Sequence, residues 1–144
     1  MVDLTAPLTE LVAVLEATEV SARELLDLHL ERIDRLDGPI NSVVTLVPEL
    51  ARAEAAAIDD ARTAGRDVGV LGGVPITVKD ALATAGIRST GGATELRDHV
   101  PTDDAAVVDT VRRAGAVVFG KTNIPRWSGE IGRASCRERV SKQV

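Results

Sequence analysis

A lysine, Lys79, follows a run of apolar and β-branched residues that extends from Val70 to Val78. Such a run predicts a buried strand or an extended loop, although a lysine is seldom fully buried. Desolvation at the end of a buried strand disfavours the ammonium form and lowers the pKa of a lysine, so Lys79 could act there as a base. The alternative is an exposed lysine at a strand end, paired with Asp80 or with another nearby acid.

A second lysine lies in a short pattern that matches a phosphate-binding loop. The segment from Gly115 to Thr122 fits G-x-x-x-x-G-K-[ST] at every position, which leaves a nucleotide-binding domain as an alternative. A phosphate loop needs a flexible turn after a strand, with its amides pointing inward. Here the four intervening residues are Ala, Val, Val and Phe, and Pro125 follows too soon for a helix to start. The segment therefore favours a core strand that ends in a glycine turn.

The remaining ionisable clusters favour structural roles. His29 in a predicted helix and His99 in a polar loop share no ligand spacing with each other or with Cys136, so we expect no metal site. Asp59-Asp60 and Asp103-Asp104 are paired carboxylates, but adjacent residues on a helix do not face each other. Helix capping and a solvated surface explain these pairs better than acid–base catalysis.

Three helices are predicted in the first half of the chain. Apolar residues recur at helical spacing over residues 8–17, and an alanine-rich helix is expected over residues 48–64, with Gly65 as its C′ residue. Between them, Ser21 and Glu24 have the spacing of a capping box, so we expect Ser21 to cap a helix that runs to about Leu36.

The second half of the chain changes in character. Residues 42–47 and 116–119 are expected to form short strands in addition to 70–78, and residues 85–95 form a loop rich in Gly, Ser and Thr. A further helix, capped by residues 102–104, is expected to end near Gly115. Helices that alternate with buried strands indicate an α/β fold, with the leading helices packed on the sheet.

Composition excludes several classes of function. The chain has 144 residues, of which 44% are hydrophobic and 27% charged, which is typical of a single soluble globular domain. The net charge is −5 and the basic residues are scattered, so we expect no nucleic-acid partner. We find no apolar stretch of membrane-spanning length and no signal peptide, and we expect no membrane partner and a cytoplasmic location.

Four segments, taken in order, resemble the amidase signature family. They are residues 69–80 (GVLGGVPITVKD), 84–92 (TAGIRSTGG), 102–118 and 120–123 (GKTN). The leading helices also suit that family, so the resemblance covers about the first nine-tenths of the chain. It implies the N-terminal part of the amidase-signature α/β fold, in which leading helices pack on a mixed β-sheet with covering helices, and it implies no cofactor.

The resemblance also implies a chemistry. The family hydrolyses or transfers amides through a Ser–cis-Ser–Lys triad, and by motif Lys79 corresponds to the triad lysine. As a neutral amine it would accept a proton from the bridging serine, which takes one from the nucleophilic serine. That serine attacks the carbonyl and forms an acyl-enzyme, which water or another amine resolves. Glycine-rich backbone near the nucleophile supplies the oxyanion donors.

The chain departs from the family at both serines. The family carries them in a G-G-S-S-G-G-S segment some tens of residues after the G-K-T-N turn, and this chain has no such segment. Ser128 and Ser135 lie in other contexts, which leaves Lys79 as the one candidate catalytic residue. We therefore predict that residues 1–129 are the incomplete N-terminal portion of an amidase domain, inactive alone and marginally stable, because burial of Lys79 requires packing that is missing.

For the intact parent, we predict hydrolysis of a small-molecule carboxylic amide to an acid and ammonia or an amine. Residues 123–129 resemble stand-alone hydrolases more than the alternative, an amidotransferase component that acts on charged transfer RNA. A non-catalytic, amidase-like binding module is a further alternative. Residues 130–144 are interpreted as a non-native tail, because the sequence from Ile131 resembles a translated sequencing adapter.

Overall fold

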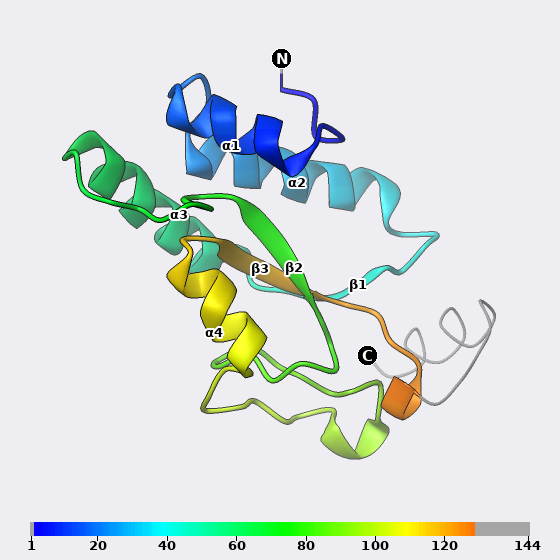
Figure 1. Cartoon of the computed structure of the whole chain (residues 1–144). Helices are drawn as coiled ribbons and strands as arrows, with labels where there is room; N and C mark the ends of the chain where they lie inside the picture. The colour runs from blue at the N-terminus through cyan, green and yellow to red at the C-terminus, as the bar shows by residue number, and fades with distance from the viewer. Residues whose placement is uncertain (1, 129–144) are drawn as a thin grey trace.

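The computed structural model describes residues 2–128, in which helices pack on both faces of a small sheet (Figure 1). The elements are, in order, α1 (Leu8–Glu16), α2 (Ala22–Leu36), β1 (Val43–Leu46), α3 (Pro48–Thr63), β2 (Pro75–Lys79), a 3-10 turn η1 (Thr94–Leu96), α4 (Ala106–Arg113), β3 (Val117–Thr122) and a second turn η2 (Arg126–Ser128). No helix within residues 2–128 has the length and apolar character needed to cross a membrane.

The three strands form a mixed sheet in the order β1–β3–β2. Strand β1 runs antiparallel to β3, and β2 runs parallel to it, with Lys79 paired to Thr122. Because parallel strands place their carboxyl ends at the same edge of a sheet, the residues that follow β2 and β3 lie close together. This is the mixed α/β arrangement that the sequence predicted.

The sheet separates two apolar clusters, since successive residues of β3 point to opposite faces. Val117 and Phe119 pack with α1, α2 and α3 on one face, whereas Val118 packs with Val108 of α4 on the other. Figure 1 shows this division, with α1 and α2 on one side of the sheet and α4 on the other.

The start of α2 is held from two sides. The predicted capping box is confirmed: Ser21 Oγ accepts a hydrogen bond from the Glu24 amide at 3.1 Å, and the Ser21 amide donates to the Glu24 carboxylate at 2.9 Å. From α3, the Asp59 carboxylate accepts from the amides of Ala22 (2.8 Å) and Arg23 (3.1 Å). Asp59 therefore caps a neighbouring helix, which agrees with the structural interpretation of this acid.

The glycines before β2 allow the chain to pass close to α2. Gly73 has a φ of +85°, and a Cβ built on it would lie 2.5 Å from the Cβ of Ala22. A side chain at this position would meet both the strain of the left-handed region and a direct overlap. This turn also shortens the strand: β2 begins at Pro75, whereas the sequence suggested an extended segment from residue 70.

The expected cap of the fourth helix is wrong. Helix α4 begins at Ala106, and its N-cap, Ala105, makes no side-chain capping bond. Asp104 instead accepts from the Ala85 amide at 2.7 Å and pairs with Arg112 of α4 at 3.2 Å. The Asp104 carboxylate therefore binds the amide of Ala85 and the side chain of Arg112, and it does not cap the first turn of α4.

Candidate active site at the carboxyl ends of β2 and β3

Lys79 is the last residue of β2, and its side chain is exposed. The preceding residue, Val78, is buried, so the predicted position at the end of a buried strand is correct. The lysine itself is exposed within residues 2–128, because it lies beside Thr122 on the opposite face of the sheet from Val78, which packs under α4. Lys79 Nζ donates to the backbone oxygen of Asn123 at 2.5 Å, rather than pairing with Asp80 as the alternative suggested.

The carbonyl that Lys79 contacts is fixed by the turn between α2 and β1. Asn123 is buried; its amide donates to Ser42 O at 2.8 Å, and its side-chain nitrogen donates to Asn41 O at 2.9 Å. The backbone beyond β3 is thereby held against a segment that lies about 80 residues earlier in the chain. The position of Lys79 Nζ depends on this turn as well as on its own strand.

The next residue, Asp80, folds the following loop back toward the strand. Its carboxylate is almost fully buried and accepts from the Thr90 amide at 3.1 Å, the Thr90 hydroxyl and the Gly92 amide at 3.5 Å. Its backbone oxygen accepts from the Gly91 amide at 3.1 Å. Asp80 thus joins the two ends of a loop over residues 80–92, which we call the site loop.

Lys121 enters the same loop from β3 and is completely buried. Its ammonium group donates to Leu82 O (2.5 Å), Thr84 Oγ1 (2.7 Å) and Ser89 Oγ (2.8 Å). Burial lowers the pKa of Lys121 to about 8, while the carboxylates of Asp80 and Asp104 act in the opposite direction.

The surroundings of Lys121 exclude a phosphate loop at Gly115–Thr122. The residues between the two glycines form the buried strand β3, and the lysine of the pattern donates to protein oxygens in the interior. The prediction of a core strand is confirmed, although the strand continues to Thr122 instead of ending at residue 119. Sequence reasoning did not assign Lys121 to the site; the signal it offered was a lysine within a strand-forming run.

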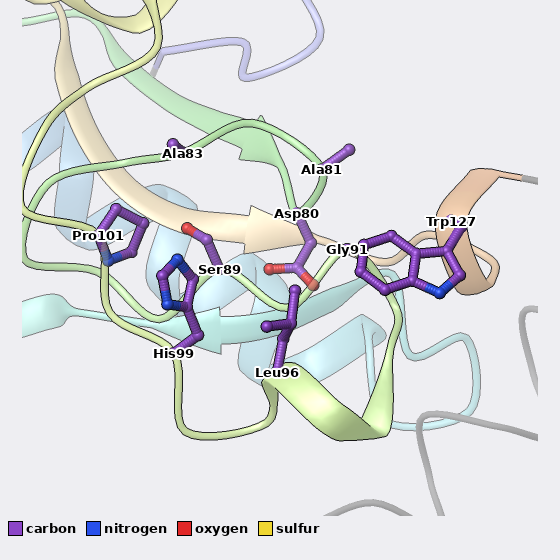
Figure 2. Close-up of a pocket in the computed structure, with 9 residues that line it drawn as sticks. All are labelled: Asp80, Ala81, Ala83, Ser89, Gly91, Leu96, His99, Pro101 and Trp127. Atoms are coloured by element: carbon purple, nitrogen blue, oxygen red, sulfur yellow. The ribbon is translucent and has the colours of Figure 1, made fainter.

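A pocket of about 280 Å³ lies beside the site loop (Figure 2). Figure 2 shows Trp127 at one end and Pro101 at the other, with the Asp80 carboxylate and the Ser89 hydroxyl between them. The pocket is lined by Asp80, Ala81, Ala83, Ser89, Gly91, Leu96, His99, Pro101 and Trp127. The site loop supplies five of these residues, so its conformation determines the shape of the pocket.

The two histidines lie in different environments. His29 is half-buried in α2 and packs near the Phe119 ring, and burial, aided by Arg32, lowers the pKa of His29. His99 is an exposed loop residue at the pocket wall. Within the part of the chain that the structure describes, no group of three His, Cys, Asp or Glu side chains could hold a metal ion.

The sequence model of the Amidase family matches residues 24–132. The chain belongs to the amidase family. The family predicted from the four ordered segments is therefore confirmed, and the match extends from the first turn of α2 to η2.

Curated proteins of similar sequence support this assignment. The chain is 45% identical over 114 residues to a glutamyl-tRNA(Gln) amidotransferase subunit from Synechococcus sp. (strain CC9311), covering 79% of this chain and 23% of that protein. It is also 45% identical over 121 residues to the protein of the same name from Chromohalobacter salexigens, covering 84% and 25%. The chain thus spans about a quarter of the length of these curated relatives.

Solved structures share the fold. The native peptide amidase from Stenotrophomonas maltophilia superimposes with a TM-score of 0.83 at 34% identity, covering 93% of this chain and 30% of that one. A bacterial aryl acylamidase of the amidase signature enzymes superimposes with a TM-score of 0.78 at 27% identity, covering 85% and 26%. Residues 2–128 therefore have the architecture of part of an amidase-signature enzyme.

Proposed function

We propose that this chain is the N-terminal portion of an amidase in which Lys79 is the terminal proton acceptor of a Ser–cis-Ser–Lys relay. The observation that carries the proposal is the position of Lys79 at the carboxyl end of β2, paired with β3 and directly before Asp80, which lines the pocket. Its Nζ is oriented by one backbone carbonyl and is otherwise open to groups that approach from outside residues 2–128. Both serines would come from a segment that the 144-residue chain does not contain.

The proposed reaction begins with two proton transfers. The bridging serine gives its proton to the neutral amine of Lys79 and takes the proton of the nucleophilic serine. The nucleophilic oxygen then attacks the amide carbon, and the carbon–nitrogen bond breaks as the leaving nitrogen recovers a proton. Water resolves the acyl-enzyme to a carboxylic acid. The desolvation that favours a neutral amine must come from packing outside residues 2–128, because Lys79 is exposed within them.

The test is the substitution Lys79→Met in the intact longer protein. Removing a general base lowers turnover by about 10² to 10⁴-fold. We therefore expect kcat to fall by at least about 100-fold while KM and expression change little. Arg66→Met, which removes an exposed cation after α3, is the matched control and should leave kcat unchanged. Near-normal turnover of Lys79→Met would give Lys79 a structural role instead.

A second candidate is an amidotransferase component, in which an amine rather than water resolves the acyl-enzyme. The curated relatives of this chain carry that name, whereas the similar solved structures include a peptide amidase and an aryl acylamidase. Incubating the intact protein with simple amides, with and without glutamyl-tRNA(Gln), separates the two. Release of acid from simple amides alone supports the hydrolase, and amide transfer that requires the charged tRNA supports the amidotransferase.

The reading frame beyond residue 129 tests the non-catalytic alternative. A downstream G-G-S-S-G-G-S segment would supply both serines, and its absence would favour a binding module. The same reading frame tests whether residues 130–144 are a non-native tail, because it shows which residues follow residue 129 in the parent protein. A small-molecule substrate and a cytoplasmic location remain predictions from the sequence.

A further inference from the structure

We propose that Lys121 is the internal anchor of the site loop and thereby a positioning residue for the pocket that this loop lines. Its relevance to catalysis rests on the proposed function of Lys79, but the anchoring itself can be tested without any activity. Lys121 does not line the pocket and contacts no group assigned to the proton relay. It would act through the backbone and the hydroxyl groups that it holds.

The three contacts of Lys121 join both limbs of the loop. Leu82 and Thr84 belong to the limb that leaves β2, and Ser89 belongs to the limb that returns to Asp80. An ammonium group has three N–H donors, so these three oxygens satisfy it completely. Thr84 and Ser89 are themselves buried, and loss of the amine would leave their hydroxyl groups without this partner.

The charged groups around Lys121 fit a buried cation. Asp80 follows β2 and Asp104 precedes α4, and both carboxylates attract the amine. Arg112 of α4 pairs with Asp104 at 3.2 Å, and Arg88 of the site loop turns toward β1, where it donates to Thr45 Oγ1 at 3.1 Å. An isolated charge in the interior would be strongly destabilising, so the hydrogen bonds and the two acids make the burial of Lys121 tolerable.

The anchor can hold the loop in either protonation state. As an ammonium, Lys121 donates to three oxygens. In the structure the Thr84 hydroxyl donates to Leu82 O at 3.1 Å and the Ser89 hydroxyl to Ile87 O at 3.0 Å. A neutral amine has two donors and one lone pair, and one of these hydroxyls can leave its carbonyl and rotate to donate to that lone pair. The two hydroxyls can act as donor or acceptor, whereas the Leu82 carbonyl can only accept.

Amide hydrogen exchange in the 144-residue chain tests the anchor. We expect Lys121→Met to raise the exchange rates of amides in residues 84–92 by about tenfold or more, because local opening of the loop no longer breaks the Lys121 contacts. Amides of α2 and α3 should stay within about twofold. Lys79→Met is the matched control: it removes the lysine that ends the adjacent strand and should leave exchange in the site loop unchanged.

Milder variants keep the test decisive if Lys121→Met does not fold. Thr84→Val and Ser89→Ala each retain Lys121 and remove one acceptor, and each should raise exchange in residues 84–92 selectively. Unchanged exchange in all three variants would refute the anchor. A uniform rise across the helices and the loop would instead make Lys121 an ordinary core residue.

A pH profile distinguishes an ionisable anchor from a steric one. Because burial lowers the pKa of Lys121 from the ordinary 10.5 to about 8, the folded chain binds fewer protons than the unfolded chain between these values. The free energy of unfolding should therefore rise with pH above about 8. Urea unfolding at pH 7.5, 8.5 and 9.5 should show this rise in the wild type relative to Lys121→Met, or relative to Thr84→Val if the former does not fold. For Lys121→Met, parallel profiles would overturn an ionisable anchor. Thr84→Val keeps the amine but removes an acceptor of its charged form, so a larger rise is expected, and an identical rise would overturn the ionisable anchor.

Discussion

Two lysines with similar local sequences have opposite environments. Each follows a run of strand-forming residues, yet Lys79 is exposed and Lys121 is fully buried. The difference lies in the face of the sheet that each occupies: Lys121 pairs with Val78 on the face covered by α4 and the site loop, whereas Lys79 pairs with Thr122 on the opposite face. The motif predicts a catalytic role for Lys79, but the sequence could not predict the burial of Lys121, because the cover on each face of the sheet depends on contacts between distant segments.

Amine acylation should distinguish these two lysines. In the folded 144-residue chain, Lys79 is expected to react at least about tenfold faster than Lys121, since a fully buried amine reacts only when the structure opens. Peptide mass spectrometry after brief labelling measures both rates. Labelling in urea provides the control, because the two rates should then converge. Equal rates in the folded chain would contradict the burial of Lys121.

At the scale of elements, short-range signals predicted the structure well. The capping box of α2 depends on residues three apart, and the bounds of α1, α2 and α3 lie within one residue or so of the predicted ranges. Predictions failed where a distant contact competed, as for Asp104, whose carboxylate binds Ala85 and Arg112 instead of capping α4. The role of Asp59 as a cap for another helix was likewise beyond local reasoning.

Asp59→Ala should destabilise the chain by about 1–2 kcal/mol, because the first amides of α2 lose their capping acceptor. The neighbouring Asp60 is exposed and provides the matched control; Asp60→Ala should change the free energy of unfolding by less than about 0.5 kcal/mol. Urea denaturation at pH 7 measures both. Equal effects of the two substitutions would mean that the cap contributes nothing measurable.

A pair of glycines separates backbone strain from packing. Gly73 and Gly65 both have positive φ, but a Cβ at Gly73 would overlap Ala22, whereas a Cβ at Gly65 would meet open space. Gly65→Ala should cost about 1–2 kcal/mol from the left-handed backbone alone. Gly73→Ala should cost about 1–3 kcal/mol more, because the overlap forces β2 away from α2. If thermal or urea denaturation shows the same loss of stability for both variants, the turn accommodates a side chain at Gly73 without additional cost.

At the scale of the whole molecule, the chain carries part of the family's fold, and we predict that it carries only part of the site. It spans about a quarter of its curated relatives, and the ordered motifs were enough to predict both the family and the mixed sheet. The sequence could not predict how far Lys79 would be covered, because that depends on segments outside residues 2–128. Membership of the amidase family therefore does not by itself show that the 144-residue chain is active.

The 144-residue chain should not form an acyl-enzyme. A fluorophosphonate probe, which captures activated serines, is expected to leave the chain unlabelled because neither serine of the proposed relay is present. The intact longer protein, treated in parallel, is the positive control. Stoichiometric labelling of the 144-residue chain would show that another serine is activated and would overturn its predicted inactivity.

The parallel pairing of β2 with β3 has a consequence for the order of folding. These strands are joined by residues 80–116, whereas α2 and α3 meet across a much shorter connection and share the Asp59 cap. Contacts with small sequence separation close at a lower entropic cost, so we expect the helical pair to form early and the strand pair late. Substitutions in the site loop should then accelerate unfolding and leave the refolding rate nearly constant, so that the proposed site is the last part of this chain to assemble and the first to be lost.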